Sequence, residues 1–301
     1  MKEIKPWLKA MRLRTLPLST SGIIAGTCFA FYNGRFSWWV LVLAILTTIS
    51  LQILSNLAND FGDSENGADN ANRVGPTRAV QSGEITPEEM LEAIKFNIIV
   101  VIILSIALIW AAFGPTNFLF VLLFLCLGGV SVYAALNYTM GDSPYGYRAL
   151  GDIFVFIFFG LVSTIGSYVL YMQKVDHVIV LPAIILGLLS VGVLNLNNMR
   201  DLNADKEVGK VTVAVKLGIK KAKQYHFVLV IGALVVTFIF SILYYVEPYN
   251  FLYLIAYIPL IRHLIVIKSA ETPADFDSQL KVLALSTFVL ALLLGVGYIL
   301  Y

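Results

Sequence analysis

The fold of this chain is decided by one stretch: Asn56-Leu57-Ala58-Asn59-Asp60-Phe61-Gly62-Asp63-Ser64-Glu65-Asn66-Gly67-Ala68-Asp69. It follows directly on a run of about twenty apolar residues, the length that crosses a bilayer as a helix. A second cluster follows another such run: Asn197-Asn198-Met199-Arg200-Asp201-Leu202-Asn203-Ala204-Asp205. Carboxylates at the ends of membrane helices are costly, so they indicate a functional site.

The composition is that of a membrane protein. Hydrophobic residues make up 58% of the 301 residues, charged residues 13%, and the mean hydropathy is +0.82. These values lie outside the range of soluble globular domains. Nine apolar runs have the length of a transmembrane helix: 15–33, 37–58, 93–113, 117–139, 152–172, 178–200, 225–246, 249–268 and 281–300. We therefore expect an all-α polytopic membrane protein with about nine transmembrane helices, forming a single domain over 1–301.

Basic residues are distributed unevenly between the two sides of the membrane. If the N-terminus is cytoplasmic and the chain alternates through nine helices, 19 of the 21 lysine and arginine residues lie in cytoplasmic segments. Only Arg35 and Lys174 lie outside, which is the distribution of the positive-inside rule. We expect a multi-pass protein of the cell inner (cytoplasmic) membrane, with its N-terminus, both acidic clusters and the active-site loops on the cytoplasmic side.

Each acidic cluster has the spacing of a stripe along one helix face. The first stripe comprises Asn56, Asp60 and Asp63, and the second comprises Asn197, Asp201 and Asp205. Two facing stripes would supply oxygen ligands from both sides, which suits Mg²⁺. Mg²⁺ usually takes one or two carboxylates together with phosphate oxygens, so a diphosphate would complete its shell. The alternative is that these are solvated acids at helix ends.

Basic residues follow both acidic clusters. Arg73 and Arg78 lie a few residues beyond the first cluster, where they could hold a diphosphate by bidentate hydrogen bonds. The alternative is ordinary positive-inside loop charge. Lys206 and Lys210 follow the second cluster and are either topology determinants or neighbours of the phosphate.

The loop 138–152 is rich in glycine and tyrosine and carries one arginine. Tyr138 and Arg148 could point at an aromatic or anionic co-substrate. Alternatively, Tyr145 and Tyr147 belong to the interfacial aromatic belt, and Asp152 caps the following helix.

These residues resemble a known family. The two clusters look like the aspartate-rich motifs of the UbiA-type intramembrane prenyltransferases, and most closely those of the 1,4-dihydroxy-2-naphthoate prenyltransferases of menaquinone synthesis. The resemblance is carried by residues 12–17, 56–69, 75–78, 144–152 and 197–218. It implies a nine-helix fold around a central cavity that opens to the cytoplasm and sideways to lipid. It also implies a Mg²⁺-dependent aromatic polyprenyltransferase.

The spacing of the polar residues and the resemblance together assign roles to individual residues. The metal ligands would be Asp60, Asp63, Asp69, Asp201 and Asp205. Substrate-binding residues would be Arg12, Asn59, Arg73, Tyr138, Asn197 and Lys206, and catalytic residues Asp63, Asp201, Arg78 and Arg148. There are two departures from the family pattern. The interval from Asp63 to Asp69 is longer than the usual spacing, and Asp142 stands where many members carry a lysine after Tyr138, so the basic role passes to Arg148.

The resemblance implies transfer of a polyprenyl group from polyprenyl diphosphate to 1,4-dihydroxy-2-naphthoate, with release of diphosphate and CO₂. The implied partners are these two substrates and the lipid bilayer, with no nucleic acid and no obligatory protein partner. One alternative is a prenyltransferase for another aromatic acceptor, such as 4-hydroxybenzoate. A distant alternative is a membrane transporter, which should carry its acids near the bilayer midplane rather than at helix ends.

Overall fold

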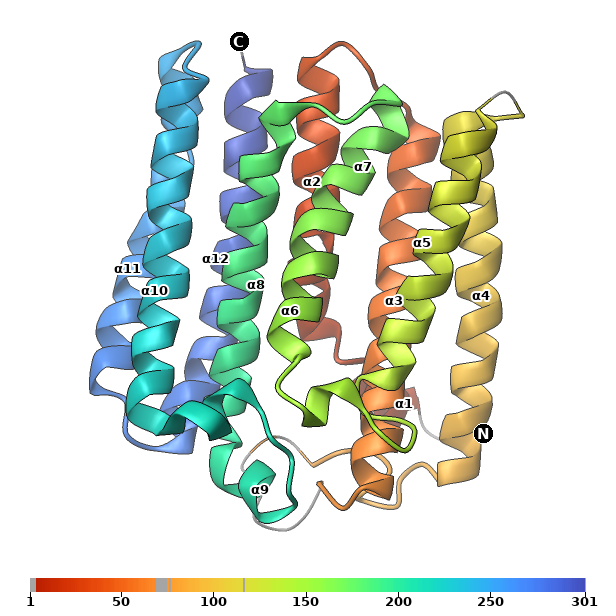
Figure 1. Ribbon diagram of the computed structural model, residues 1–301, viewed down its shortest axis with the longest axis vertical. Coiled ribbons are helices and arrows are strands. Elements are labelled where there is room, and N and C mark those ends of the chain that lie inside the picture. Colours follow the sequence, from red (N-terminus) through yellow and green to blue (C-terminus); the bar gives the residue numbers. More distant parts are fainter. Residues whose placement is uncertain (1–3, 69–74, 76, 116, 301) are drawn as a thin grey trace.

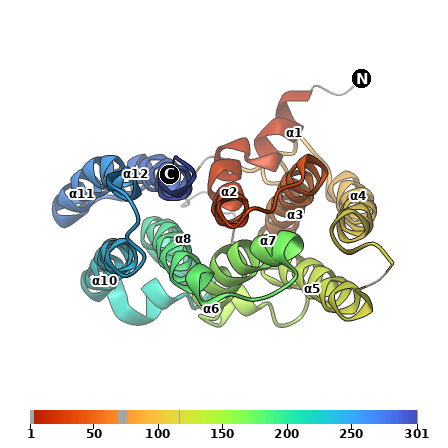
Figure 2. The same cartoon turned by 90° about the horizontal axis from the view of Figure 1, so that it is seen from above.

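A computed structural model of the protein describes residues 4–68, 75, 77–115 and 117–300. Within these ranges the chain is helical, and the only β pairing is an isolated bridge between Arg148 and Val211. The long helices stand roughly parallel to one another (Figure 1). Seen from above, α10, α11 and α12 lie on one side of the molecule and α3, α4 and α5 on the other, with α2, α7 and α8 between the two groups (Figure 2). The predicted all-α membrane fold is confirmed.

The helices have the following bounds. The long helices are α2 (Leu16–Tyr32), α3 (Trp38–Glu65), α4 (Pro87–Phe113), α5 (Phe118–Asn137), α8 (Val180–Arg200), α10 (Val213–Leu243), α11 (Leu254–Ser269) and α12 (Pro273–Ile299). One further span is built from α6 (Gly151–Val155), the π-helical segment η3 (Phe156–Val162) and α7 (Ser163–Met172). The short helices are α1 (Ile4–Met11), η1 (Leu13–Thr15), η2 (Tyr145–Tyr147), η4 (His177–Ile179), α9 (Leu202–Glu207) and η5 (Pro248–Phe251).

The number of membrane-spanning helices differs slightly from the expected nine. Among the described residues, eight helical segments are long and apolar enough to cross a membrane. The remaining predicted span, the run 15–33, corresponds to α2, which has 17 residues. A helix of this length is about 25 Å long, at the lower end of what a bilayer core requires. All nine predicted apolar runs are therefore helical, and α2 stands among the other long helices (Figure 1).

Several helices begin well before their apolar run. Helix α4 begins at Pro87 because Thr86 and Glu89 form a capping box at its first turn. Helix α12 begins at Pro273 with the same arrangement of Thr272 and Asp275. These capped turns carry the helices past the apolar region toward the end of the molecule where the polar loops lie.

Helix α2 packs closely on α7 through small residues. Gly22 and Gly26 of α2 face Ser163 and Ser167 of α7, and a Cβ atom added at either glycine would overlap the facing serine hydroxyl. Small residues spaced by four allow two helix backbones to approach closely inside a membrane. This contact forms one wall of the cavity described below, because Ser163 and Ser167 also line it.

The outer helices present apolar side chains outward. Ala134 is the only buried residue of α5, while Phe118 and Leu119 are 74% and 75% exposed. Other large exposed side chains lie along α4, α10 and α11, including Trp110, Val228 and Ile258. Such a surface is stable in contact with lipid tails and not with water. It fits the multi-pass membrane protein predicted from the apolar runs.

Candidate active site

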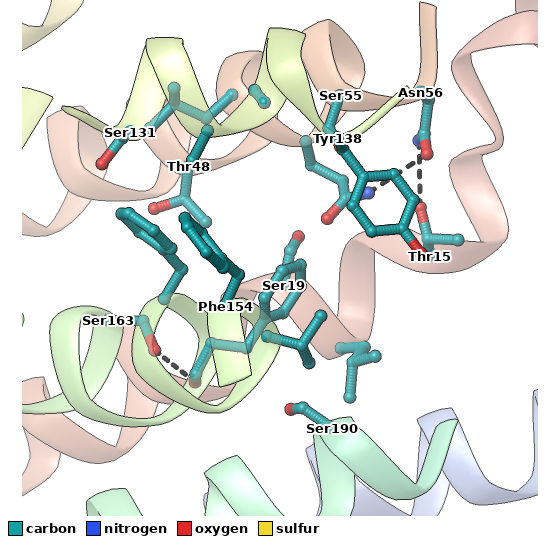
Figure 3. Close-up of a pocket in the computed structure, with 18 of the residues that line it drawn as sticks. Thr15, Ser19, Thr48, Ser55, Asn56, Ser131, Tyr138, Phe154, Ser163 and Ser190 are labelled. Atoms are coloured by element: carbon teal, nitrogen blue, oxygen red, sulfur yellow. Dashed lines mark hydrogen bonds between the residues drawn. The ribbon is translucent and has the colours of Figure 1, made fainter. Parts of the chain in front are cut away.

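The two acidic clusters meet at one cavity of about 430 Å³. At its polar end the cavity is lined by Asn59, Asp63, Asn197, Asp201 and Asp205. Its other walls are apolar or carry hydroxyl groups, and Figure 3 shows Thr48, Ser131, Ser163 and Ser190 around it. Phe124, Ile109 and Leu170 line the part contributed by the membrane-spanning portions of α5, α4 and α7. The cavity therefore has a charged end and an apolar body.

Asp63 is the most heavily engaged acid of the first cluster. It lies near the end of α3 and is 1% exposed. Arg78 Nη2 lies 2.8 Å from one carboxylate oxygen. Lys210 Nζ lies 3.3 Å from the other oxygen, to which the Tyr147 hydroxyl also donates at 2.8 Å. A buried carboxylate needs such cations and donors to offset its loss of hydration.

Lys210 connects the two acidic clusters. Its Nζ atom lies 3.3 Å from Asp63 and 3.8 Å from Asp205, and 5.0 Å from the centre of the Tyr147 ring. The backbone N–H of Val211 donates to the Tyr147 carbonyl at 3.1 Å, which holds the two loops together. The sequence grouped Lys206 with Lys210, but Lys206 is exposed on α9 and does not line the cavity.

Asp60 has different neighbours from Asp63, although both were predicted as metal ligands. Its two oxygens accept hydrogen bonds from the backbone N–H groups of Ala79 and Val80, at 3.2 and 3.3 Å. Asp60 therefore fixes the loop that carries Arg78, and it does not line the main cavity. These amides compete directly with a metal for the carboxylate, so we leave Asp60 out of the proposed metal site.

The second acidic cluster includes Arg200, for which the sequence predicts no role in the site. Arg200, at the end of α8, donates from Nε and Nη2 to the two oxygens of Asp201, at 2.8 and 2.6 Å. Nη2 also donates to Asn197 Oδ1 at 2.8 Å, and Nη1 to Asp277 of α12 at 2.7 Å. Asp277 was not predicted, because nothing in its local sequence separates it from other acids near helix starts.

Arginines surround the first cluster. Arg78 is buried and donates from Nη1 to the Asn59 carbonyl oxygen at 2.6 Å. Arg12 has the left-handed backbone conformation at φ 48°, which is uncommon for a residue with a side chain. Arg12 and Arg78 line the main cavity and also a smaller hollow of about 290 Å³ beside it. Lys9, Arg14 and Arg200 also line this hollow, so its walls are strongly basic.

Aromatic rings form another part of the cavity wall. Tyr138 packs against Tyr145 with ring centres 5.3 Å apart, and Tyr145 stacks on Phe154 at 3.9 Å. All three residues line the cavity. Burial raises the pKa of Tyr138 above its ordinary value, and the nearby Asp63 raises it further. Tyr138 therefore keeps its proton at neutral pH and can act as a hydrogen-bond donor.

Arg148 was predicted to point at the co-substrate together with Tyr138, but the structure does not bring it into the cavity. Its side chain is exposed, and Arg148 is not among the residues that line the cavity. The reason is that the backbone of residue 148 pairs with Val211, and Tyr147 turns toward Asp63 instead. The buried cation that acts electrostatically on Tyr138 is Arg78, which lines the same cavity. Asp69 and Arg73 lie outside the described residues, so their predicted roles remain predictions.

The family can be identified from comparison with known proteins. Residues 20–286 match the family model described as the UbiA prenyltransferase family. The chain is 43% identical over 251 residues to the 1,4-dihydroxy-2-naphthoate octaprenyltransferase of Escherichia coli (strain K12), covering 83% of this chain and 80% of that protein. The chain belongs to the UbiA prenyltransferase family.

Other UbiA proteins agree with this identification. The 1,4-dihydroxy-2-naphthoate octaprenyltransferase of Haemophilus influenzae (strain ATCC 51907 / DSM 11121 / KW20 / Rd) is 36% identical over 302 residues, covering 98% of this chain and 96% of that protein. The apo structure of a UbiA homolog from Aeropyrum pernix K1 has the same fold, with a TM-score of 0.69 at 16% identity over 96% of this chain and 98% of that one. A UbiA homolog from Archaeoglobus fulgidus bound to DMAPP and Mg²⁺ gives a TM-score of 0.61 at 16% identity, covering 95% and 98%.

Proposed function

We propose that this UbiA-family enzyme transfers a polyprenyl group from polyprenyl diphosphate to 1,4-dihydroxy-2-naphthoate, releasing diphosphate and CO₂. The observation that carries the proposal is the shape and polarity of one cavity. Acids and cations from both halves of the chain line one end, and the remaining walls are largely apolar. A prenyl diphosphate has the same division into an anionic head and an apolar tail. The names of the Escherichia coli and Haemophilus influenzae relatives support the naphthoate as the acceptor.

The oxygen donors of the cavity fit a magnesium ion. Asp63, Asp201 and Asp205 offer carboxylates, and Asn59 Oδ1 is buried with no hydrogen-bond partner among the described residues. The described part of the chain contains no group of three or more His, Cys, Asp or Glu side chains placed to hold a metal ion. Mg²⁺ usually takes one or two carboxylates from the protein and completes its shell with water and substrate phosphates. We assign these four residues and Asn197 to the ion and its phosphate ligand, with Asp69 still a predicted member. When bound, Mg²⁺ stabilises the charge of the departing diphosphate.

The cations of the cavity hold the diphosphate. Arg78 and Lys210 are buried next to Asp63, and Arg12 acts on Asp63 electrostatically. In a site with little water, these charges stabilise the leaving group more strongly than they could in solution. The bond between prenyl C1 and the diphosphate oxygen breaks, and its electron pair leaves with the diphosphate. An allylic cation develops at C1, and the apolar walls exclude water that would capture it.

The aromatic wall receives the acceptor. Tyr138, Tyr145 and Phe154 offer ring faces and edges against which a naphthalene ring can stack. The ring carbon that bears the carboxylate attacks C1 and forms the new carbon–carbon bond. The bond to the carboxylate then breaks, CO₂ leaves, and the electron pair restores the aromatic ring. The product is demethylmenaquinol, which remains in the membrane. In this proposal the protein acts in the inner membrane with its polar loops cytoplasmic, and the reaction requires no obligatory protein partner.

The proposal is tested by prenyl transfer with purified protein in detergent. The assay contains a polyprenyl diphosphate, Mg²⁺ and either 1,4-dihydroxy-2-naphthoate or 4-hydroxybenzoate, and mass spectrometry identifies the product. We expect demethylmenaquinol only with the naphthoate, loss of product on adding EDTA, and a fall of about 100-fold in Asp63→Asn and Asp201→Asn. The control Asp142→Asn changes an exposed loop acid and should retain activity. Product from 4-hydroxybenzoate alone would reject the acceptor, and no product with either would reject the enzyme activity.

A further inference from the structure

The Arg200 guanidinium is buried between two carboxylates from different helices. The side chain is 1% exposed, and its three nitrogens donate four hydrogen bonds of 2.6–2.8 Å. Two of these form a fork on Asp201 at the end of α8, and one reaches Asp277 on α12. A planar guanidinium can satisfy this arrangement, whereas a lysine ammonium cannot.

Arg200 is unsuited to bind substrate itself. It does not line the main cavity, while Asp201 and Asp277 do. All three of its nitrogens already donate to side chains of the protein. Any effect of Arg200 on the reaction must therefore pass through the side chains that it holds, with two hydrogen bonds to Asp201 and one to Asn197, which makes it a positioning residue.

The second carboxylate changes the charge that the cavity presents. Arg200 and Asp201 alone would form a neutral ion pair, and a neutral pair attracts a divalent cation only weakly. With Asp277 the group carries two negative charges and one positive charge, so it keeps a net negative charge. Asp277 also draws Nη1 toward α12, so that the guanidinium is shared and does not neutralise Asp201 alone.

We propose that Arg200 and Asp277 form a positioning pair that holds both Asp201 oxygens in a fixed plane and keeps Asp201 sufficiently negative to take a divalent cation. This inference rests on the proposed assignment of Asp201 to the magnesium–diphosphate site. Arg200 and Asp277 would then belong to the site although neither binds the metal. A residue that hydrogen-bonds to a metal ligand fixes the orientation of that ligand and tunes the affinity of the ligand for the metal. The pair also makes α12 part of the site, although α12 carries neither aspartate-rich cluster.

The test compares Asp277→Asn and Arg200→Lys with two matched controls. Glu271→Gln removes an exposed acid just before α12, and Arg262→Lys makes the same exchange at an exposed position on α11. The first readout is the Mg²⁺ concentration that half-maximally raises the melting temperature at fixed inorganic pyrophosphate. The second is the Mg²⁺ dependence and the maximal rate of prenyl transfer.

Asp277→Asn should raise the Mg²⁺ midpoint about 10-fold in both readouts, with a nearly unchanged rate at saturating Mg²⁺. Arg200→Lys keeps the charge but loses the fork, so its maximal rate should fall about 10-fold even at saturating Mg²⁺. Both controls should match the wild type.

A purely structural role makes a different prediction. Both variants would then melt at lower temperature without ligand, while the Mg²⁺ midpoint and the rate per folded molecule stayed at wild-type values; that result would overturn the inference. Arg200→Lys decides the question if Asp277→Asn does not fold. No Mg²⁺ response in the wild type would overturn both the pair and the metal assignment. A wrong acceptor would instead appear only in the product assay, because pyrophosphate binding needs no acceptor.

Discussion

Two lysines four residues apart in the sequence differ completely in their surroundings. Lys206 is exposed on α9, whereas Lys210 lies in the cavity between Asp63 and Asp205. The difference arises at Gly209, whose φ of 73° reverses the chain and allows the Lys210 N–H to bond the Asp205 carbonyl at 2.8 Å. Sequence spacing places both lysines near the acids, but only the turn decides which one enters the cavity.

Lys210→Met should therefore abolish most activity, while Lys206→Met should not. Removing the ammonium leaves Asp63 and Asp205 without a shared cation. It also removes a charge that, in the proposed mechanism, holds the diphosphate. We expect the turnover number to fall about 100-fold in Lys210→Met, the usual cost of one lost group that stabilises the leaving charge. Steady-state prenyl transfer measures both variants. Equal activities of the two variants would show that Lys210 has no role in the reaction.

At this scale the sequence predicted residue types better than residue contacts. Asp63 and Asp201 line the cavity as expected, because they stand at the ends of apolar helices. Asp60 lies on the same helix stripe as Asp63, yet its carboxylate accepts hydrogen bonds from the backbone N–H groups of Ala79 and Val80. Arg148 is likewise directed outward by a backbone pairing between distant loops. Such contacts depend on tertiary structure, and helix periodicity carries no information about them.

At the scale of the helices, hydropathy located every long helix but not its polar end. The apolar run predicted near 93–113 belongs to α4, which begins at Pro87, and the run near 281–300 belongs to α12, which begins at Pro273. Hydropathy measures only the part inside the hydrocarbon. The capping signals Thr86-Pro87 and Thr272-Pro273 mark the true starts, and they were available in the sequence.

The contact between α2 and α7 gives a prediction about helix packing. Gly26→Ala should destabilise the protein, because the new Cβ atom would overlap Ser167 Oγ and lie 2.5 Å from the Thr164 carbonyl oxygen. Overpacking of this kind costs about 1–3 kcal/mol. The control is Gly129→Ala on α5, where a Cβ atom meets nothing within 4 Å and should stabilise the helix by up to about 1 kcal/mol. Melting temperatures in detergent provide the comparison, and equal values would contradict the close approach.

At the scale of the whole molecule, polar and apolar functions are separated along one axis. The loop between α5 and α6, helix α9 and the ends of α3 and α8 gather at one end of the molecule, while the loop between α7 and α8 lies at the opposite end (Figure 1). The end with the acids also carries most of the lysines and arginines. The sequence could predict this polarity because charge counts need no tertiary structure.

Thiol labelling tests the orientation of this axis. In a chain whose Cys28 and Cys126 are replaced by serine, Ser143→Cys and Lys174→Cys place single exposed thiols at the two ends. With intact cells or right-side-out vesicles, a membrane-impermeant maleimide should label Lys174→Cys directly and Ser143→Cys only after permeabilisation. The reverse pattern would place the acidic clusters outside the cell and contradict the positive-inside assignment.

The ion pairs of the cavity have a consequence for how its ligands bind. Asp63 and Asp205 already share Lys210, and Arg78 neutralises further charge on Asp63. In the proposed site, Mg²⁺ would take the oxygens of Asp63 and Asp205, and Arg78 and Lys210, released from these carboxylates, would hold the phosphate oxygens. Binding of either ligand would free groups that bind the other, so the two affinities would be linked. By reciprocity, each ligand would raise the affinity for the other by the same factor. From the proposed site we therefore expect free magnesium to be a heterotropic effector of prenyl-donor affinity, and the internal ion pairs of Asp63 and Asp205 to be restored once diphosphate has left.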